Sequence, residues 1–378
     1  MRSSVRKAII ILLAVVVIGT LIYRSRDAIR LEGFSWDKLG SAVRHADVPM
    51  LLLALLGIQV CFALRAFRWT RFSRYLDRAT YSNIFASTVI GFSAIFLLGR
   101  AGEPIRPLLI ARKDEIPVSS AFGIYVLERM FDMASTVVLA SVALLAVPRL
   151  ASAGEGNPLL AAARTTGIVL LAGLVMGVAF LVYFRLHGAA QLERRMDAWR
   201  AAGVTGWRQR VAGLVGGFSQ GLQAIRSLSD FFFAVVISAV HWTLIAVIYY
   251  WVARSFGGRL AELGLSDALL VVAFTMAGST VQLPGVGGGS QVASFLAYTA
   301  IFKVENEPAM AAAITVWLIT FAGSTVLGIP LLIKEGWSMG ELRRLASAEK
   351  EAEAHGGHVE PNAPAPMKSG SARGDSRR

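Results

Sequence analysis

The sequence is poor in charge for its length. Only 17% of its 378 residues are Asp, Glu, Lys or Arg, whereas a soluble domain carries about a quarter, and 55% are apolar. This balance excludes a water-soluble globule, and the apolar content excludes disorder over most of the chain. The single cysteine, Cys61, excludes a disulfide scaffold. We therefore interpret the chain as a membrane protein.

Long apolar runs make up most of the sequence. They lie at residues 8–23, 48–64, 79–99, 119–147, 166–184, 231–253, 268–302 and 309–333. An apolar run of about 18 residues or more is long enough to cross the hydrocarbon core as a helix. The first run is short and follows three basic residues, so a cleaved signal peptide is the alternative to a retained helix. We expect a retained helix, because nothing after it is typical of a secreted domain.

Two of the runs are interrupted by helix breakers. The run at 79–99 leads into 100–107, where glycine and two prolines lie among charges, and the run at 268–302 contains a Pro/Gly cluster at 283–290. Broken backbone at membrane depth is tolerated only where it is buried in protein or lines a wet cavity. We therefore expect two re-entrant helical hairpins. The predicted fold class is an all-α polytopic membrane protein with about six spanning helices plus these hairpins.

The order of these elements predicts two similar halves. Residues 48–147 and 231–333 each contain a span, a hairpin and a span, in opposite orientations, which is the pattern of an inverted repeat. We expect one integral membrane domain at 1–340, including an amphipathic cytoplasmic linker at 185–230. The polar segment at 341–378 is predicted to be a disordered cytoplasmic tail.

The basic residues indicate an orientation rather than a nucleic-acid partner. A net charge of +13 and a pI near 10.3 would suggest nucleic acid in a soluble protein, but here the charges lie between apolar runs. Most of the 38 lysines and arginines fall on one side of the proposed plan. The positive-inside bias therefore predicts an inner (plasma) membrane protein with both termini in the cytoplasm.

Charged side chains inside the apolar runs are the first candidates for a site. Glu128 and Asp132 are four residues apart and share one helix face, with Arg129 beside them. The first breaker segment adds three charged residues: Arg100, Glu103 and Arg106. Ionisable groups at membrane depth are expensive unless they are paired. Two interpretations stay open, a three-against-three ion network that pins a hairpin to a helix, or a headgroup site.

Four arginines follow the second apolar run at every third position: Arg65, Arg68, Arg71 and Arg74. The last two are expected to anchor the helix end to anionic headgroups. Arg65 and Arg68 lie closest to the membrane, where a guanidinium is suited to bidentate contact with phosphate. We expect Arg65 to lie outside the ion network of the hairpin.

The sequence contains no recognisable motif for a catalytic site. The glycine run at 285–289 follows no predicted strand and lacks the pattern of a dinucleotide site. No spacing of nucleophile and base, or of metal ligands, stands out. We therefore expect no cofactor, no metal and no enzymatic activity.

Three motifs together are similar to those of a known family. They are the run from Gly99 to Arg106, the group Glu128, Arg129 and Asp132, and the late segment from Pro284 to Gly289. The chain resembles the lysylphosphatidylglycerol synthase transmembrane family, flippase-like membrane domains that occur alone or fused to an aminoacyltransferase. The resemblance covers about residues 45–335 and implies the lipid-handling part without the synthase domain. It implies further site residues in the late motif: Pro284, Gly285 and Gln291, the last where the family often has an acidic residue.

The leading hypothesis is flippase-like translocation or handling of an anionic or phosphate-bearing lipid. In it, five arginines attract the headgroup: Arg65, Arg68, Arg100, Arg106 and Arg129. Three acidic residues hold those arginines in place: Glu103, Glu128 and Asp132. Membrane lipids are then the partners. The alternative is a non-catalytic scaffold or accessory subunit for a lipid-modifying transferase, in which the ionic cluster is purely structural.

Overall fold

The computed structural model describes residues 35–76, 78–146, 165, 168–169, 171–176, 227–279, 282–283, 287–336 and 340. The predicted first helix at 8–23 and the predicted tail at 341–378 lie outside the described residues. So do most of 166–184 and nearly all of the predicted linker at 185–230.

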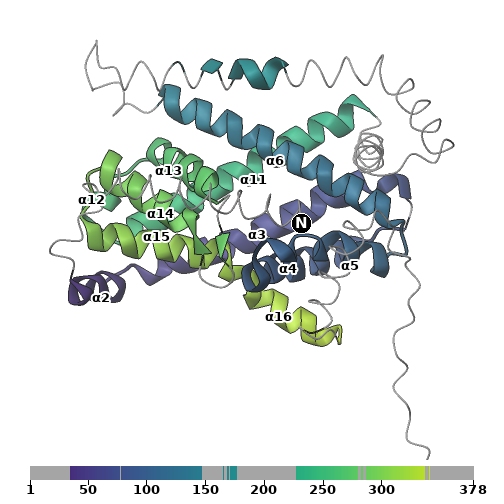
Figure 1. Ribbon diagram of the computed structural model, residues 1–378, viewed down its shortest axis with the longest axis horizontal. Coiled ribbons are helices and arrows are strands. Elements are labelled where there is room, and N and C mark those ends of the chain that lie inside the picture. The colour runs from purple at the N-terminus through teal and green to yellow at the C-terminus, as the bar shows by residue number, and fades with distance from the viewer. Residues whose placement is uncertain are drawn as a thin grey trace, which may run out of the picture.

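Most of the described residues are helical (Figure 1). The α-helices are α2 (Trp36–Arg44), α3 (Val48–Phe72), α4 (Tyr81–Leu98), α5 (Ile105–Lys113), α6 (Val118–Ala146), α11 (Leu228–Ser255), α12 (Gly258–Ala261), α13 (Leu265–Gly278), α14 (Gly289–Leu296), α15 (Asn306–Thr320) and α16 (Thr325–Lys334). Short helical turns are η1 (Arg74–Leu76), η2 (Gly99–Gly102), the π-turn η4 (Ala297–Ile301) and η5 (Ala322–Ser324). Two strands of two residues, β1 (Gln282–Leu283) and β2 (Gly287–Gly288), pair antiparallel. The predicted helical class is confirmed for this part of the chain.

Several of these helices are long and apolar enough to cross a membrane. Among the described residues they are α3, α4, α11 and the continuous segment Asn306–Lys334, which joins α15 to α16. They coincide with the runs predicted at 48–64, 79–99, 231–253 and 309–333. The 29-residue α6 carries the predicted charged triplet near its middle. The chain is a multi-pass membrane protein, as its hydropathy predicts.

α3 extends beyond its predicted end at residue 64 and continues to Phe72. Its start is fixed by Asp47, whose Oδ1 accepts a hydrogen bond from the Met50 amide at 3.2 Å. The extension places Arg65 and Arg68 on a continuing helix, where they are only 8% and 1% exposed. Because these two charges are paired inside the protein, the helix does not have to end at the membrane surface.

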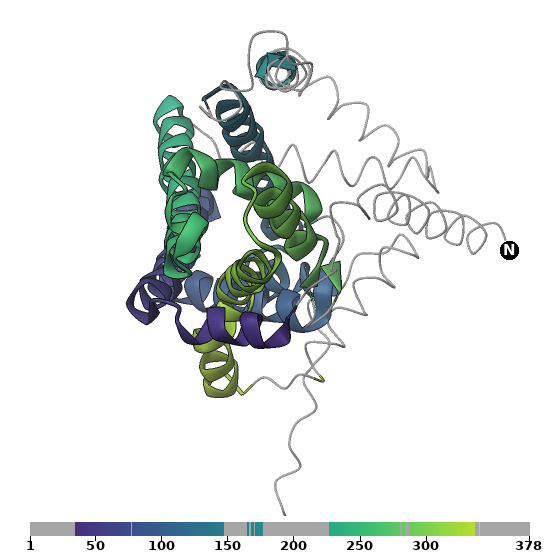
Figure 2. The same cartoon turned by 90° about the vertical axis from the view of Figure 1, so that its left-hand side faces the viewer.

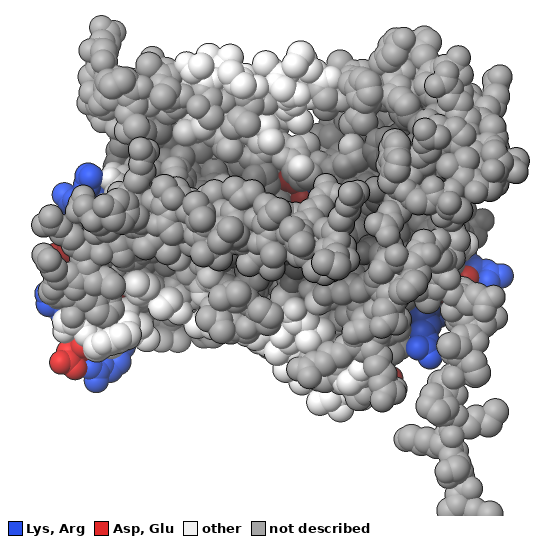
Figure 3. Space-filling model, in the orientation of Figure 1, with Lys and Arg blue, Asp and Glu red and all other residues white. Residues whose placement is uncertain are grey.

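Polar contacts between helix termini lie at the two ends of the molecule. Near α2 and α12, they are Ser35 N to Glu307 Oε1 (3.0 Å), Asp47 N to Ser255 O (2.8 Å) and Arg259 Nη1 to Lys303 O (2.8 Å). At the other end, they are Arg71 Nε to Asp230 Oδ1 (2.7 Å), Asn83 Nδ2 to Asp114 Oδ1 (2.7 Å) and the Lys113–Glu335 pair. The basic groups visible in Figure 3 also lie at the two ends of the long axis. Two membrane surfaces would impose this distribution.

α4 and α5 form a helical hairpin that starts and finishes at one end of the molecule. The hydrogen bond between Asn83, in the first turn of α4, and Asp114, the C-cap of α5, joins its two ends. The chain turns at η2, where Gly99 has a φ of 64°, a value that favours glycine. A Cβ on Gly102 would lie 2.5 Å from the Ala94 carbonyl, so only glycine allows this approach to α4.

α13 and α14 form a second hairpin, which starts and finishes at the opposite end. The Arg259–Lys303 hydrogen bond joins the segments that precede and follow it. The chain reverses between β1 and β2, and β1 lies against η2, so the tips of the two hairpins meet. Figure 1 shows the two hairpins in opposite halves of the long axis, and Figure 2 looks along that axis from the α2 end.

Among the described residues, three apolar cores support these hairpins; one joins α4 and α5 to α16 through Ile90, Leu109 and Leu332, and the other two are larger. The largest core joins α3 and α11 to α13, α14 and α15, with Trp242 and Phe295 among its buried side chains. The second core joins α3 and α4 to α5 and α6 through Trp69, Ile110 and Ile124. The candidate site borders this second core, because Trp69 belongs to both.

Candidate functional site

Glu128 lies at the centre of a buried ionic cluster. Its side chain is fully buried, and it faces four guanidinium groups, of which that of Arg129 is the most distant at 4.0 Å. Its Oε1 is 2.9 Å from Arg65 Nη1 and 3.1 Å from Arg68 Nη2. Its Oε2 is 2.8 Å from Arg106 Nη1 and accepts a hydrogen bond from Trp69 Nε1 at 2.8 Å. One carboxylate therefore binds side chains from α3 and α5 to α6.

Asp132 extends this cluster by one turn of α6. It shares a helix face with Glu128, as the four-residue spacing predicts. Its Oδ2 is 2.7 Å from Arg65 Nη1, and its Oδ1 is 2.9 Å from Arg68 Nη2. Arg129 Nη2 lies 3.1 Å from Asp132 Oδ2. Arg65 and Arg68 thus each bridge both carboxylates.

Arg106 is the member of the cluster that comes from α5. Its guanidinium stacks on the Trp69 ring, 5.0 Å from the ring centroid, and lies 5.9 Å from the Phe92 centroid. The residue is only 2% exposed. Its Nη1 forms an ion pair with Glu128 Oε2, and neither this nitrogen nor Nε or Nη2 makes a hydrogen bond within the described part of the protein. The edge formed by Nε and Nη2 presents two parallel N–H groups, the geometry that binds two oxygens of one phosphate or carboxylate.

Gly91 on α4 allows the buried position of Arg106, because it lets α5 approach α4 closely. A Cβ on Gly91 would lie 2.5 Å from Arg106 Cβ and 3.2 Å from its Cα. The two helices could not approach so closely with any larger residue there. The sequence places a small residue on α4 where α5 crosses it, and the depth of the guanidinium follows from that crossing.

The cluster carries more positive than negative charge. We call its six members the arginine cluster: Arg65, Arg68, Arg106, Arg129, Glu128 and Asp132. Four guanidinium groups face two carboxylates. Glu103 adds a third carboxylate nearby, where it accepts a hydrogen bond from Tyr125 Oη at 3.2 Å. With or without Glu103, positive charge remains in excess, which is expensive in a buried site unless an anion compensates it.

One side of the arginine cluster is more open than the rest. The Arg129 side chain is 38% exposed, compared with 10% for Arg65 and 8% for Asp132. The Arg129 guanidinium lies over the Tyr125 ring, 5.3 Å from its centroid. Arg129 is therefore the member of the arginine cluster that is most accessible to an anion from outside.

The structure corrects the predicted membership of the network. Arg65, predicted to lie outside it, makes two of its shortest ion pairs, and Arg68 joins it too. The three-against-three network is wrong in this respect, because it counted charges near each other in sequence and missed those that α3 brings in. Glu103 bonds to Tyr125. Arg100 lies in η2 at the hairpin tip.

Two polar members of the site have no place in the sequence prediction. Trp69 donates to Glu128, and its position four residues after Arg65 on one helix is the signal that could have found it. Ser238 on α11 accepts a hydrogen bond from Arg68 Nη1 at 2.6 Å. Nothing in the sequence marks Ser238, because its role depends on how α11 packs against α3.

The residues predicted in the second hairpin are only partly described. Gln291 Oε1 accepts a hydrogen bond from the Gly288 amide and so caps the start of α14. Pro284 and Gly285 lie outside the described residues. Among the described residues, no three His, Cys, Asp or Glu side chains are grouped to hold a metal ion. The chemistry that the arginine cluster offers is the binding of anions.

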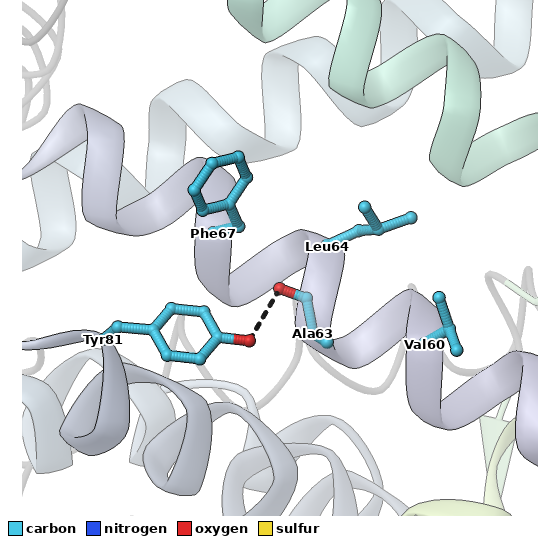
Figure 4. A pocket seen from close by; sticks show the side chains of 5 residues that line it. All are labelled: Val60, Ala63, Leu64, Phe67 and Tyr81. Carbon is cyan, nitrogen blue, oxygen red and sulfur yellow. Dashed lines mark hydrogen bonds between the residues drawn. The ribbon is translucent and has the colours of Figure 1, made fainter.

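An apolar groove of about 430 Å³ lies along α3 beside the start of α4 (Figure 4). It is lined by Val60, Ala63, Leu64, Phe67 and Tyr81. The Tyr81 hydroxyl donates to the Ala63 carbonyl at 3.5 Å, which joins the start of α4 to α3. The groove has no charged lining residue and adds no polar chemistry to the site.

Comparison with known proteins gives one match. The model of the lysylphosphatidylglycerol synthase TM region matches residues 9–328 of the chain. No curated protein matches it. The matched range includes both hairpins and every member of the arginine cluster.

Proposed function

The chain belongs to the family of the lysylphosphatidylglycerol synthase TM region, and we propose that it binds an anionic, phosphate-bearing lipid and moves it across the inner membrane. The proposal concerns binding and transport rather than bond chemistry. A guanidinium stays protonated at physiological pH, so the arginine cluster can attract and orient an anion but does not serve as an acid or a base.

The observation that carries this proposal is the unpartnered edge of Arg106. Its Nε and Nη2 are buried without a hydrogen-bond partner in the described residues, although buried donors are nearly always satisfied. Two oxygens of one phosphate would satisfy both groups. The excess of positive charge in the arginine cluster supports the same ligand, because one phosphodiester would neutralise part of it.

The two hairpins support a transport role. We propose that each is re-entrant, since each begins and ends at one end of the molecule and the two enter from opposite ends. Two such halves in opposite orientation would form an inverted repeat, which permits alternating access to a site between them. In this proposal both termini are cytoplasmic, and the end that holds Arg71 and Asp230 faces the cytoplasm.

A leaflet-resolved assay tests the proposal. The purified protein is placed in phosphatidylcholine vesicles with fluorescent phosphatidylglycerol, and a membrane-impermeant quencher reports the fraction in the outer leaflet over time. Arg106→Lys keeps the charge but removes the fork, so we expect it to slow lipid movement about tenfold while expression stays normal. The matched control is Arg112→Lys, the same change at an exposed position of α5.

Equal transport by wild type and Arg106→Lys would show that Arg106 does not bind the headgroup. If the wild-type protein moves none of three lipids in such vesicles (phosphatidylglycerol, phosphatidic acid and a neutral lipid), the transport proposal fails. A scaffold for a lipid-modifying transferase would then be the better account.

A further inference from the structure

Arg106 differs from the other buried arginines in how it is held. Arg65 and Arg68 each contact both Glu128 and Asp132, so neither depends on one carboxylate. Arg106 pairs with Glu128 alone within the described part of the chain. The position of the Arg106 guanidinium therefore depends on the Glu128 carboxylate alone, which also accepts hydrogen bonds from Arg65, Arg68 and Trp69.

This ion pair also joins two different parts of the fold. Arg106 belongs to α5, in the first hairpin, whereas Glu128 belongs to α6. A second polar contact joins the same two parts of the fold. The Tyr125 hydroxyl on α6 donates a hydrogen bond of 3.2 Å to Glu103 Oε2, just before α5. The contact between α5 and α6 thus combines an ion pair in the first turn of α5, a hydrogen bond to Glu103 at the hairpin tip, and apolar packing of Ile110 against α6.

We propose that an incoming phosphate group competes with Glu128 for Arg106, and that this exchange loosens α5 from α6. The inference rests on the proposed function and assigns to Glu128 the role of an internal anion that the ligand displaces. It couples occupation of the site to movement of the first hairpin.

The geometry favours exchange over simple addition. A phosphate on the Nε and Nη2 edge would share one guanidinium with the Glu128 carboxylate, and the two anions would repel each other in a buried site. Glu128 can give up this contact, because Arg65, Arg68 and Trp69 still donate to it. Arg106 can give it up because the ligand supplies a negative charge in place of the carboxylate.

The packing around Arg106 and Glu128 indicates which helices would stay together when their ion pair breaks. Gly91 allows α4 to lie within van der Waals contact of Arg106, so α5 is held closely against α4. Glu128 and Asp132 are held against α3 by Arg65 and Arg68. When the ion pair between Arg106 and Glu128 breaks, α5 therefore stays with α4, and its contact with α6 is reduced to the apolar packing of Ile110 and Ile124. A ligand shifts the population toward this state because Arg106 has no competing carboxylate in it.

Hydrogen exchange measured by mass spectrometry tests this inference. The full chain is placed in phosphatidylcholine nanodiscs with and without phosphatidylglycerol, and binding is measured separately by native mass spectrometry. We expect phosphatidylglycerol to speed amide exchange in residues 105–113 by about tenfold, because α5 loses the buried ion pair that holds it against α6. Exchange in α3 should stay unchanged.

Three variants separate the exchange from general loosening. Arg106→Gln should show fast exchange in α5 without lipid and no further response to it. Tyr125→Phe removes the neutral contact and leaves the charges intact, so it should keep the response to lipid. Glu128→Gln should resemble Arg106→Gln, and Arg106→Gln carries the test if Glu128→Gln does not fold.

The outcomes distinguish this inference from the proposed function. If phosphatidylglycerol binds but exchange in α5 stays constant or slows, the exchange mechanism is wrong and lipid binding stands. If phosphatidylglycerol does not bind, the proposed function fails and the inference fails with it. An equal response to inorganic phosphate, added to phosphatidylcholine nanodiscs without phosphatidylglycerol, would support the exchange and count against a lipid ligand.

Discussion

Replacing Glu128 by glutamine should destabilise the protein more than replacing Arg106 by glutamine, although the two side chains form one ion pair. The reason is the charge of the arginine cluster. Glu128→Gln leaves four guanidinium groups facing Asp132 alone, and it weakens the interactions with Arg65, Arg68 and Arg106 at 2.8–3.1 Å. Arg106→Gln removes one ion pair and also lowers the excess of positive charge.

The magnitudes follow from how many ion pairs each substitution breaks. Breaking a buried ion pair from one side costs about 3–5 kcal/mol, so we expect at least this decrease in unfolding free energy for Glu128→Gln. For Arg106→Gln we expect less, about 1.5–3 kcal/mol, because Glu128 keeps its hydrogen bonds from Arg65, Arg68 and Trp69 and is not left unpaired. The difference between the midpoints of these ranges, about 2 kcal/mol, corresponds to more than a tenfold change in the unfolding equilibrium.

Reversible unfolding in mixed micelles, followed by circular dichroism, measures both values. Glu103→Gln is the matched control, because it makes the same chemical change at a half-buried carboxylate that accepts from Tyr125. We expect it to shift the unfolding free energy by less than about 1 kcal/mol. If Arg106→Gln proves as destabilising as Glu128→Gln, the reasoning from excess positive charge is wrong.

Three further outcomes are expected. Arg65→Ala should lower the unfolding free energy by about 3–5 kcal/mol in the same assay, since Arg65 bridges two buried carboxylates; a neutral effect would contradict the cluster geometry. Gly91→Ala should slow lipid movement in vesicles more than Arg112→Lys does, because a Cβ there would lie 2.5 Å from that of Arg106; an unchanged rate would show that the depth of α5 is not critical. The Ser371→Cys variant on a Cys61→Ser background should react with an impermeant thiol reagent only in opened cells; labelling of intact cells would reverse the orientation.

Local patterns in the chain were enough for the class of protein and for much of its plan. Apolar run length predicts α3, α4, α11 and the segment Asn306–Lys334, because a bilayer of given thickness demands helices of given length. The Pro/Gly clusters predict where the hairpins turn, since those residues break a helix whatever surrounds them. The shared face of Glu128 and Asp132 follows from the helical repeat alone.

The partners of those carboxylates were decided by tertiary packing. Arg65 and Glu128 are 63 residues apart, and no spacing within either segment indicates that α3 and α6 meet there. Charge counting near the breaker segment therefore placed Arg65 outside the network, whereas helix packing brings it to the centre. The same holds for Ser238, which contacts Arg68 only because α11 packs against α3.

The unpartnered edge of Arg106 shows this division most directly. Its sequence position beside two prolines indicates a helix break among charges, and nothing more. The number of hydrogen bonds that its N–H groups make depends on how closely α5 approaches α4, which Gly91 determines. It depends also on Glu128, the one carboxylate that pairs with Arg106 among the described residues. Periodicity and hydropathy describe one segment at a time, whereas the balance of a buried charge cluster is a sum over helices that only the folded chain brings together.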